Sequence, residues 1–527
     1  MMRDFHTSGR SAVYAENGVC ATSHPLAAKV AISLLEGGGN AVDAAIGAAV
    51  LLGICEPHMT GIGGDCFALV KRPGTDALIG LNGSGRAPRG LSADALRDAG
   101  HSKMPVHDPA AVTIPGAVDA FCRLHGDMGR MEMAEVLAPA IHYAEAGVPV
   151  APRVASDWQS GPALLHGRAR DFYLNNGAAL KMGQAFRAPA QADVLRRIAR
   201  EGRAGFYEGE VAEDIVASMT ALGGTHTLDD LAATACDYVT PISGTYKAVE
   251  LTELPPNGQG ATAILIANIL SHFDIAGMEP FGAERAHIEV EATKLAYDAR
   301  NRFIADYDHV TRLAHLLDPA TARGLAALID PKQVIANPHV TSEGVHKDTV
   351  YLTVVDRDRM AVSLIYSIFN SFGSGLATDR FGILMQNRGT GFSLEKDHPN
   401  EAGPRKRPMH TIIPAFLREA DGSEMPFGVM GGQYQSTGHV RFISNMVDFG
   451  MEPQAAIDGP RCFWEAGDLR IERGYAPEVV QALADLGHKP VTPPTAIGGA
   501  QAIRIDAKTG VLMGASDPRK DGCALGY

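Results

Sequence analysis

The stretch HKDTVYLTVVDRDRMAVSLIYS, residues 346–367, marks an abrupt change in the character of the chain. Two runs rich in β-branched and aromatic residues, TVYLTVV and AVSLIYS, are separated by four polar residues at 356–359. This pattern predicts a hairpin of two long strands, and Thr349 stands at the start of the first. The preceding residues 337–348, NPHVTSEGVHKD, show neither helical nor strand periodicity and predict a flexible polar connection.

A threonine in this position can become a nucleophile if the peptide bond ahead of it is broken. A hydroxyl needs a base, and a new N-terminus supplies an α-amino group with a pKa of about 7.7 to 8.0. Rotation about χ1 is restricted in a β-branched residue, so a strand would hold the hydroxyl in one direction. We therefore expect cleavage between Asp348 and Thr349. The simpler alternative is that Thr349 only opens a strand.

The regions on either side of this hairpin predict alternating helices and strands. Residues 25–36 and 41–55 have the pattern of two helices, separated by three glycines and with Asn40 as the cap of the second. Glycine-rich turns follow, each joined to an apolar run near 65–70 and 78–83. Helical periodicity dominates 115–235 and 260–330, and further helices are expected near 438–449 and 476–487.

Composition narrows the classes of function. The chain has 527 residues, 46% hydrophobic and 20% charged, which is typical of a folded globular protein. A net charge of −13 without a basic run argues against nucleic acid as a partner. The seven cysteines are scattered without ligand spacing, which predicts a reducing compartment and no zinc site. The polar N-terminus and the lack of a long apolar run predict a cytoplasmic location and no membrane contact.

Eight motifs occur in order along nearly the whole chain: GGGNAVDAA (37–45), EPHMTGIGGD (56–65), PPNGQG (255–260), DTVYLTVVD (348–356), NSFGSG (370–375), GPRKRP (403–408), VMGGQ (429–433) and GASDPR (514–519). Through them the chain resembles the γ-glutamyltransferase family of N-terminal nucleophile hydrolases. Each motif is weak alone, and together they are specific.

The resemblance implies an α+β fold with four αββα layers. It also implies a proenzyme that cleaves itself into fragments 1–348 and 349–527, which stay associated as one unit. Thr349 would attack an amide, Ser367 takes the place of a second threonine that hydrogen-bonds the nucleophile, and Gly431 and Gly432 match the oxyanion hole. Two consecutive glycine N–H groups can approach a developing oxyanion closely. No cofactor or metal is expected, and a homodimer remains open.

The predicted substrate pocket departs from the γ-glutamyl pattern. Phe369 replaces an asparagine, while Arg388 and Gly391 replace the glutamine and aspartate that hold the α-amino group. His410 and Thr411 replace a pair of serines, and Ser84 replaces an arginine, with Arg86 two residues later. A guanidinium and an imidazole thus stand where γ-glutamyltransferases bind the ammonium group of their substrate. We therefore expect the substrate to be a small amide that bears a carboxylate and lacks a free α-amine.

Several interpretations stay open from the sequence alone. Glutathione-like γ-glutamyl compounds are expected from the overall resemblance, and the divergent pocket favours a small anionic amide such as oxamate, or an acylase substrate. An unprocessed binding protein without catalysis is a third hypothesis. Gly431 and Gly432 could form a plain turn, Ser367 could satisfy a backbone group, and Arg86 and Arg388 could be ordinary ion-paired residues. The loop at 61–64 lacks the spacing of a nucleotide-binding motif.

Overall fold

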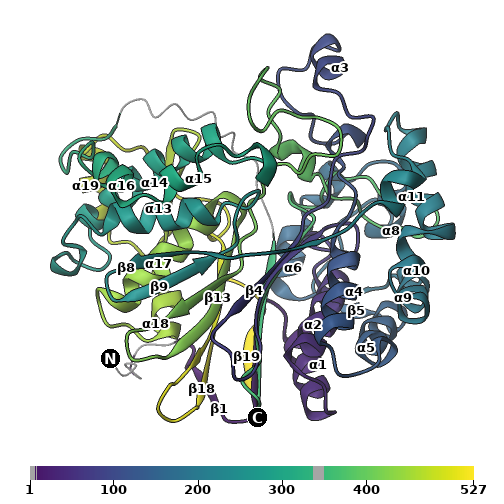
Figure 1. Ribbon diagram of the computed structural model, residues 1–527, viewed down its shortest axis with the longest axis horizontal. Helices are drawn as coiled ribbons and strands as arrows, with labels where there is room; N and C mark the ends of the chain where they lie inside the picture. The colour runs from purple at the N-terminus through teal and green to yellow at the C-terminus, as the bar shows by residue number, and fades with distance from the viewer. Residues whose placement is uncertain (1–5, 7–8, 336–348) are drawn as a thin grey trace.

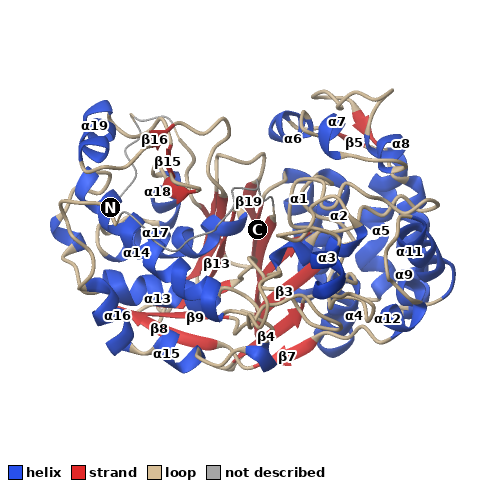
Figure 2. Cartoon of the chain, turned by 90° about the horizontal axis from the view of Figure 1, so that it is seen from above, coloured by secondary structure: helices blue, strands red, loops and turns tan. Residues whose placement is uncertain are grey.

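The computed structural model describes residue 6, residues 9–335 and residues 349–527. Two seven-stranded antiparallel sheets lie face to face at the centre, and helices cover the outer face of each, as Figures 1 and 2 show. The predicted α+β fold with four αββα layers is confirmed. Residues 337–348, including Asp348, lie outside the described residues.

Sheet A pairs strands from both ends of the chain with strands from its middle. In spatial order it contains β1 (Val13–Ala15), β18 (Leu512–Ser516), β17 (Gly499–Ile505), β13 (Glu424–Met430), β12 (Ala415–Arg418), β9 (Val249–Glu253) and β8 (Ile242–Tyr246).

Sheet B carries the predicted hairpin at its centre. It contains β19 (Cys523–Gly526), β2 (Gly18–Thr22), β10 (Val350–Asp356), β11 (Ala361–Ser367), β3 (Asp65–Lys71), β4 (Leu78–Gly83) and β7 (Asp237–Val239). Strands from before position 349 pair directly with strands from after it: β2 pairs with β10 and β19, and β3 pairs with β11. The two fragments predicted by cleavage there would therefore share one hydrogen-bonded sheet.

The helices form two outer layers. On the side of sheet B lie α1 (Pro25–Glu36), α2 (Ala41–Cys55) and α4 (Ala117–Met128), and outside them α5 (Met133–Ala146) on α2 and α9 (Pro189–Glu201) on α5. On the side of sheet A lie α13 (Gly260–Leu270), α17 (Gln435–Val447) and α18 (Pro453–Asp458), with α14 (Ala283–Phe303) and α16 (Pro319–Ala326) packed on α13. None of the helices in the described residues combines the length and apolarity that crossing a bilayer requires.

Shorter elements complete the chain. The remaining helices are α3 (Ala93–Asp98), α6 (Pro152–Trp158), α7 (Gly161–Leu164), α8 (Ala169–Tyr173), α10 (Ala204–Tyr207), α11 (Gly209–Ala221), α12 (Leu228–Ala232), α15 (Leu313–Leu317) and α19 (Pro477–Asp485). Small sheets are made by β5 (Val148–Pro149) with β6 (Ala185–Phe186), and by β14 (Cys462–Glu465), β15 (Asp468–Ile471) and β16 (Pro490–Val491).

The predicted helix pair α1 and α2 is confirmed, with the predicted cap. The Asn40 side chain accepts from the backbone N–H groups of Val42 and Asp43, and the Asp43 carboxylate accepts from Asn40 N at 2.9 Å. This reciprocal arrangement satisfies N–H groups that have no partner within the helix. All residues of α2 are buried, which agrees with a helix that is apolar on every side.

Strand β10 is held in place from both faces. It is buried along its length between α2 and strands β13 and β17 of sheet A. The sheets approach closely where the Tyr351 ring packs on Gly428, since a Cβ at position 428 would lie 2.4 Å from that ring. The strand therefore gives Thr349, the residue directly before it, a rigid support.

Candidate active site

The candidate nucleophile and its partner lie opposite each other on the hairpin. Val350 pairs with Tyr366 in the antiparallel register of β10 and β11, so Thr349 and Ser367 face one another one step further along. Their hydroxyl oxygens are 3.3 Å apart, and both residues are fully buried. The predicted contact between Thr349 and Ser367 is present in the structure.

The Ser367 hydroxyl also receives two N–H groups. It accepts from the backbone of Phe369 at 2.9 Å and from Arg388 Nη2 at 3.3 Å. Because these donors occupy the lone pairs of the oxygen, Ser367 is favoured as the donor toward Thr349. A hydrogen bond donated to Thr349 Oγ1 stabilises negative charge on that oxygen as it attacks.

A close backbone approach fixes the end of strand β11. A Cβ on Gly64 would lie 2.3 Å from the Ser367 carbonyl oxygen, so only glycine fits in this turn. Gly64 N donates to the Gly61 carbonyl at 2.9 Å, which closes the turn. The loop at 61–64 thus has the structural function of supporting Ser367.

Arg388 is a buried cation next to the candidate nucleophile. Its guanidinium lies 3.9 Å from the centre of the Phe369 ring and donates to Thr411 Oγ1 at 2.9 Å. Phe369 adopts a φ of 81°, which turns its ring beneath the guanidinium. Burial lowers the pKa of Arg388 from 12.5 to about 9, so it is protonated at neutral pH.

Arg388 has an incomplete set of partners within the described part of the chain. Its Nε atom is buried without a hydrogen-bond acceptor there. The Asp65 carboxylate raises the Arg388 pKa through its charge, but it is itself paired with His410. A buried charge of this kind is costly unless an anion compensates it, so the arrangement can receive an anionic group close to Thr349.

A chain of hydrogen bonds links Arg388 to the glycine pair. Thr411 accepts from Arg388 through its side chain, and its carbonyl accepts from Gln259 Nε2 at 2.7 Å. The same Gln259 amide donates to the Gly432 carbonyl at 3.1 Å. The pocket and the candidate oxyanion loop, residues 431–433, are therefore positioned together.

The oxyanion loop has a conformation that requires glycine. Gly431 and Gly432 have φ values of 124° and 57°, and a Cβ at Gly431 would lie 2.9 Å from Gly498 Cα. Gln433 is held on both sides, because its side chain accepts from Arg300 and its carbonyl from Tyr297. Such a fixed turn between β13 and α17 can present N–H groups to an oxyanion without rearrangement.

His410 is part of the support beneath the pocket. Its Nε2 lies 3.0 Å from Asp65 Oδ2, and its Nδ1 accepts from Ile412 N at 3.3 Å. Burial, together with the positive charge of Arg388, lowers the pKa of His410 from 6.5 to about 3. The imidazole is therefore neutral, with both nitrogens engaged, and it adds no positive charge to the pocket beside Arg388.

Arg86 has ion-pair partners of its own. Its Nη1 lies 3.2 Å from Asp306 Oδ2, its Nη2 lies 3.7 Å from Asp237 Oδ2, and its side chain is 41% exposed. These contacts give Arg86 a function in joining loops, and its predicted contact with substrate stays a prediction. The cleavage position also stays a prediction, since Asp348 is outside the described residues.

One buried group in the described residues has the side chains of a metal site. Candidate ligand atoms of His287, Glu291 and His488 lie within 4.8 Å of one another. The two imidazoles are hydrogen-bonded at 2.8 Å, and Lys294 lies 2.7 Å from Glu291. These contacts satisfy the group internally, and the ammonium would repel a cation. The expectation that no metal takes part stays a prediction.

A comparison with known protein families identifies the family of the chain. The family described as gamma-glutamyltranspeptidase matches residues 27–527. The chain belongs to this family. As a member of the gamma-glutamyltranspeptidase family it is an N-terminal nucleophile hydrolase that is made as a proenzyme, as the resemblance in the sequence implied.

Relatives within the gamma-glutamyltranspeptidase family differ in substrate. The chain is 36% identical to the glutathione hydrolase-like YwrD proenzyme of Bacillus subtilis, over 95% of this chain and 97% of the relative. It is 35% identical to the oxamate amidohydrolase proenzyme of Klebsiella pneumoniae, over 97% and 98% of the two chains. The structure of a cephalosporin acylase from Bacillus halodurans has a TM-score of 0.91 and 37% identity, covering 100% and 99% of the two chains.

Two residues that support the site were not singled out by the sequence analysis. Asp65 accepts from the backbones of Gly85 and Gly116 at 2.9 and 3.1 Å, and Gln259 joins Thr411 to Gly432. Both stand inside glycine-rich motifs that the sequence analysis did quote. A polar side chain placed among glycines, where it can reach backbone groups, was the available signal.

Proposed function

We propose that this amidohydrolase cleaves itself ahead of Thr349 and then hydrolyses amides whose acyl group carries a carboxylate and no α-amino group. The observation that supports the proposal is the buried guanidinium of Arg388. Two successive contacts of 3.3 Å, through Ser367, connect it to Thr349. A short dicarboxylic acyl group can bridge the nucleophile and this cation.

The reaction follows from the groups at the site. The α-amino group of Thr349 removes the proton from Oγ1, which attacks the amide carbonyl and forms an ester. The N–H groups of Gly431 and Gly432 bind the oxyanion, and the protonated α-amino group gives its proton to the departing amine. Water, activated by the same amine, then hydrolyses the ester and releases the acid.

The state of the carboxylate nearest to Arg388 in the described residues distinguishes the proposal from γ-glutamyl specificity. The nearby carboxylate, Asp65, accepts from two backbone N–H groups, from Gln386 and from His410. Because these donors already hydrogen-bond the Asp65 carboxylate, it is not available to bind an ammonium group of the substrate. The glutathione-type relatives support the γ-glutamyl alternative, and the oxamate amidohydrolase relative supports a small anionic amide.

A matched pair of substrates separates these possibilities. Glutaryl-p-nitroanilide and γ-glutamyl-p-nitroanilide differ only in the α-amino group. We expect kcat/KM to be about tenfold or more higher for the glutaryl compound, because an ammonium beside Arg388 is repelled. Oxamate, followed by ammonia release, tests the shortest acyl group. Preferred turnover of the γ-glutamyl compound would overturn the proposed specificity.

Intact-mass analysis tests the cleavage independently of substrate. We expect two polypeptides that begin at Met1 and Thr349, and a single full-length chain for the variant Thr349→Ala. A purified protein that stays intact after long incubation would support a binding protein without catalysis. Cleavage of the Thr349→Ala variant at the same bond would contradict the mechanism.

A further inference from the structure

Strands β12 and β13 separate just before they reach the active site. Their antiparallel ladder ends at the pair Ala415 and Phe427, and the same register would next pair Ile413 with Val429. From this point one strand leads back to Thr411, which contacts the pocket cation, and the other leads on to the oxyanion loop. The way the strands separate therefore sets the position of the loop relative to the pocket.

Two side chains of helix α17 take the backbone N–H groups of the strands at the point of separation. Val429 N donates to His439 Nε2 at 3.2 Å, and Ile413 N donates to Gln435 Oε1 at 3.0 Å. Gln435 and His439 are four residues apart, so they share one face of the helix. Both side chains are fully buried. Helix α17 thus supplies the hydrogen bonds that a neighbouring strand would otherwise supply.

The contacts of His439 assign the position of its proton. A backbone N–H can only donate, so Nε2 is the unprotonated nitrogen and Nδ1 carries the hydrogen. Nδ1 lies 2.7 Å from Oε1 of Glu253, which is buried at the end of β9. The centre of the imidazole lies 4.9 Å from the centre of the Phe427 ring. Glu253 therefore orients the imidazole as an acceptor for Val429.

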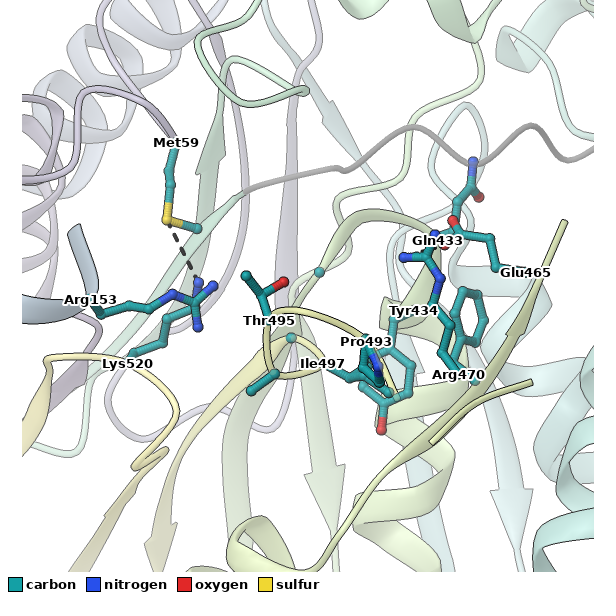
Figure 3. A pocket seen from close by; sticks show the side chains of 14 residues that line it. Met59, Arg153, Gln433, Tyr434, Glu465, Arg470, Pro493, Thr495, Ile497 and Lys520 are labelled. Carbon is teal, nitrogen blue, oxygen red and sulfur yellow. Dashed lines mark hydrogen bonds and ion pairs between the residues drawn. The ribbon is translucent and has the colours of Figure 1, made fainter. Parts of the chain in front are cut away.

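The oxyanion loop needs such a support because one side of it borders open space. Figure 3 shows Gln433 and Tyr434 at the wall of a cavity of about 80 Å³, which Gly431 also lines. On the cavity side the loop has little packing, so its position depends on the strand that enters it. Val429 lies two residues before Gly431, and His439 holds Val429.

We propose that His439 is a positioning residue for the oxyanion loop, and that Gln435 has the same part for the segment that leads to Thr411. The assignment rests on the proposed function, in which N–H groups of the loop bind the oxyanion. A displaced loop weakens binding of the transition state, so loss of the Val429 contact lowers kcat and leaves KM nearly unchanged. Loss of the Gln435 contact moves Thr411 away from Arg388, and this raises KM.

Two substitutions of His439 separate its two hydrogen bonds. His439→Gln places an amide oxygen near the position of Nε2 and keeps an acceptor for Val429. His439→Asn places an amide nitrogen near the position of Nδ1, so it keeps the donor to Glu253 and loses that acceptor. We expect kcat for the p-nitroanilide that the unmodified enzyme hydrolyses faster to fall about tenfold or more in His439→Asn, with KM changed less than about twofold. In His439→Gln we expect kcat to stay within about threefold. Equal losses in the two variants, or an unchanged kcat in His439→Asn, overturn the assignment.

Gln435→Met tests the other strand and has a matched control. We expect KM to rise about fivefold or more, because the acyl group binds beside Arg388. Gln454 accepts from Ser516 N in β18 at 2.9 Å, so Gln454→Met removes the same kind of contact elsewhere in sheet A and should leave KM within about twofold. A similar rise of KM in both variants would show that Gln435 only stabilises the sheet.

Hydrogen exchange gives a result even if neither p-nitroanilide is hydrolysed. Mass spectrometry of peptides that cover 428–434 reports the exposure of the loop, and peptides that cover 500–505 in β17 serve as the reference. We expect exchange at 428–434 to be about tenfold or more faster in His439→Asn than in His439→Gln, with the reference unchanged. Equal exchange in the two variants contradicts the assignment. The expected exchange without any hydrolysis contradicts only the proposed acyl specificity.

A second pair of variants leaves His439 in place and gives an answer even if His439→Asn does not fold. Glu253→Gln keeps an acceptor for the Nδ1 hydrogen, whereas Glu253→Met removes it and lets the imidazole turn. We expect the loop peptides to exchange about tenfold or more faster in Glu253→Met than in Glu253→Gln. Equal exchange in this pair would show that Glu253 does not orient His439 and would overturn the assignment.

Discussion

The Ser367 hydroxyl lies 3.3 Å from the Thr349 hydroxyl. The two residues face each other in the position that follows the Val350–Tyr366 pair of β10 and β11. This position ties the nucleophile to the pocket, because Ser367 also accepts from Arg388. An anion bound at Arg388 and a charge developing on Thr349 are therefore connected through one side chain. Substitutions at Ser367 should act on the rate of the chemical step.

Replacing Ser367 by alanine is expected to lower kcat by about ten- to a hundredfold, because a hydrogen bond to a charged oxygen contributes about 1.5 to 3 kcal/mol. Ser367→Thr restores a hydroxyl and should recover most of the rate. Stopped-flow measurements under single-turnover conditions report the rate of the acylation step directly. An unchanged acylation rate in Ser367→Ala would show that the contact has no part in the reaction.

Arg388→Gln tests the pocket by removing its cation. Loss of one partner of a buried charge pair costs about 2 to 5 kcal/mol, so kcat/KM for glutaryl-p-nitroanilide should fall by at least about thirtyfold. The value of kcat/KM for the γ-glutamyl compound should fall less, so the preference for the glutaryl compound becomes smaller or is reversed. Arg504→Gln is a matched control, since Arg504 pairs with Glu419 in a partly exposed network. Equal losses for both substrates would show that Arg388 only supports the fold.

The strands and helices around the nucleophile could be predicted from local sequence. The contacts that form the pocket could not be predicted from local sequence alone. The hairpin of β10 and β11 follows from two apolar runs and a polar turn, and the cap of α2 from Asn40 and Asp43. These features depend on neighbours within a few residues. The contact of Arg388 with Ser367 spans 21 residues and has no local signal, and only the family resemblance placed both residues at the site.

The remaining contacts depend on how distant segments fold together. Asp65 meets His410 across 345 residues, and Gln259 meets Gly432 across 173 residues. No periodicity encodes such pairs, because they arise where loops and strands far apart in the sequence come together in the folded chain. For the same reason the sequence suggested an imidazole facing substrate at His410, whereas in the folded chain both ring nitrogens have other partners.

Gly431→Ala is expected to lower kcat by more than about a hundredfold. A Cβ at this position would lie 2.9 Å from Gly498 Cα, and a φ of 124° is strained for alanine, so the loop at 431–433 would be displaced. Gly450→Ala is the control: Gly450 has a φ of 63° and open space at its Cβ position. Both variants strain the backbone, so a similar loss of melting temperature is compatible with the prediction. A large loss of kcat in both would point to general destabilisation.

His410→Gln tests the support beneath the pocket through the pH dependence of stability. The pKa of His410 is about 3 in the folded protein against an ordinary 6.5, so below pH 6.5 the unfolded chain takes up a proton that the folded chain excludes. The stabilisation is therefore complete above pH 6.5 and is lost as the pH falls toward 3. We expect the melting temperature of the variant, measured by differential scanning fluorimetry, to drop less between pH 7 and pH 4.5 than that of the unmodified protein.

His226, whose pKa burial lowers to about 4, provides the control, because His226→Gln should flatten the same curve while leaving kcat/KM intact. An identical pH profile in His410→Gln and the unmodified protein would contradict a neutral, buried imidazole at position 410.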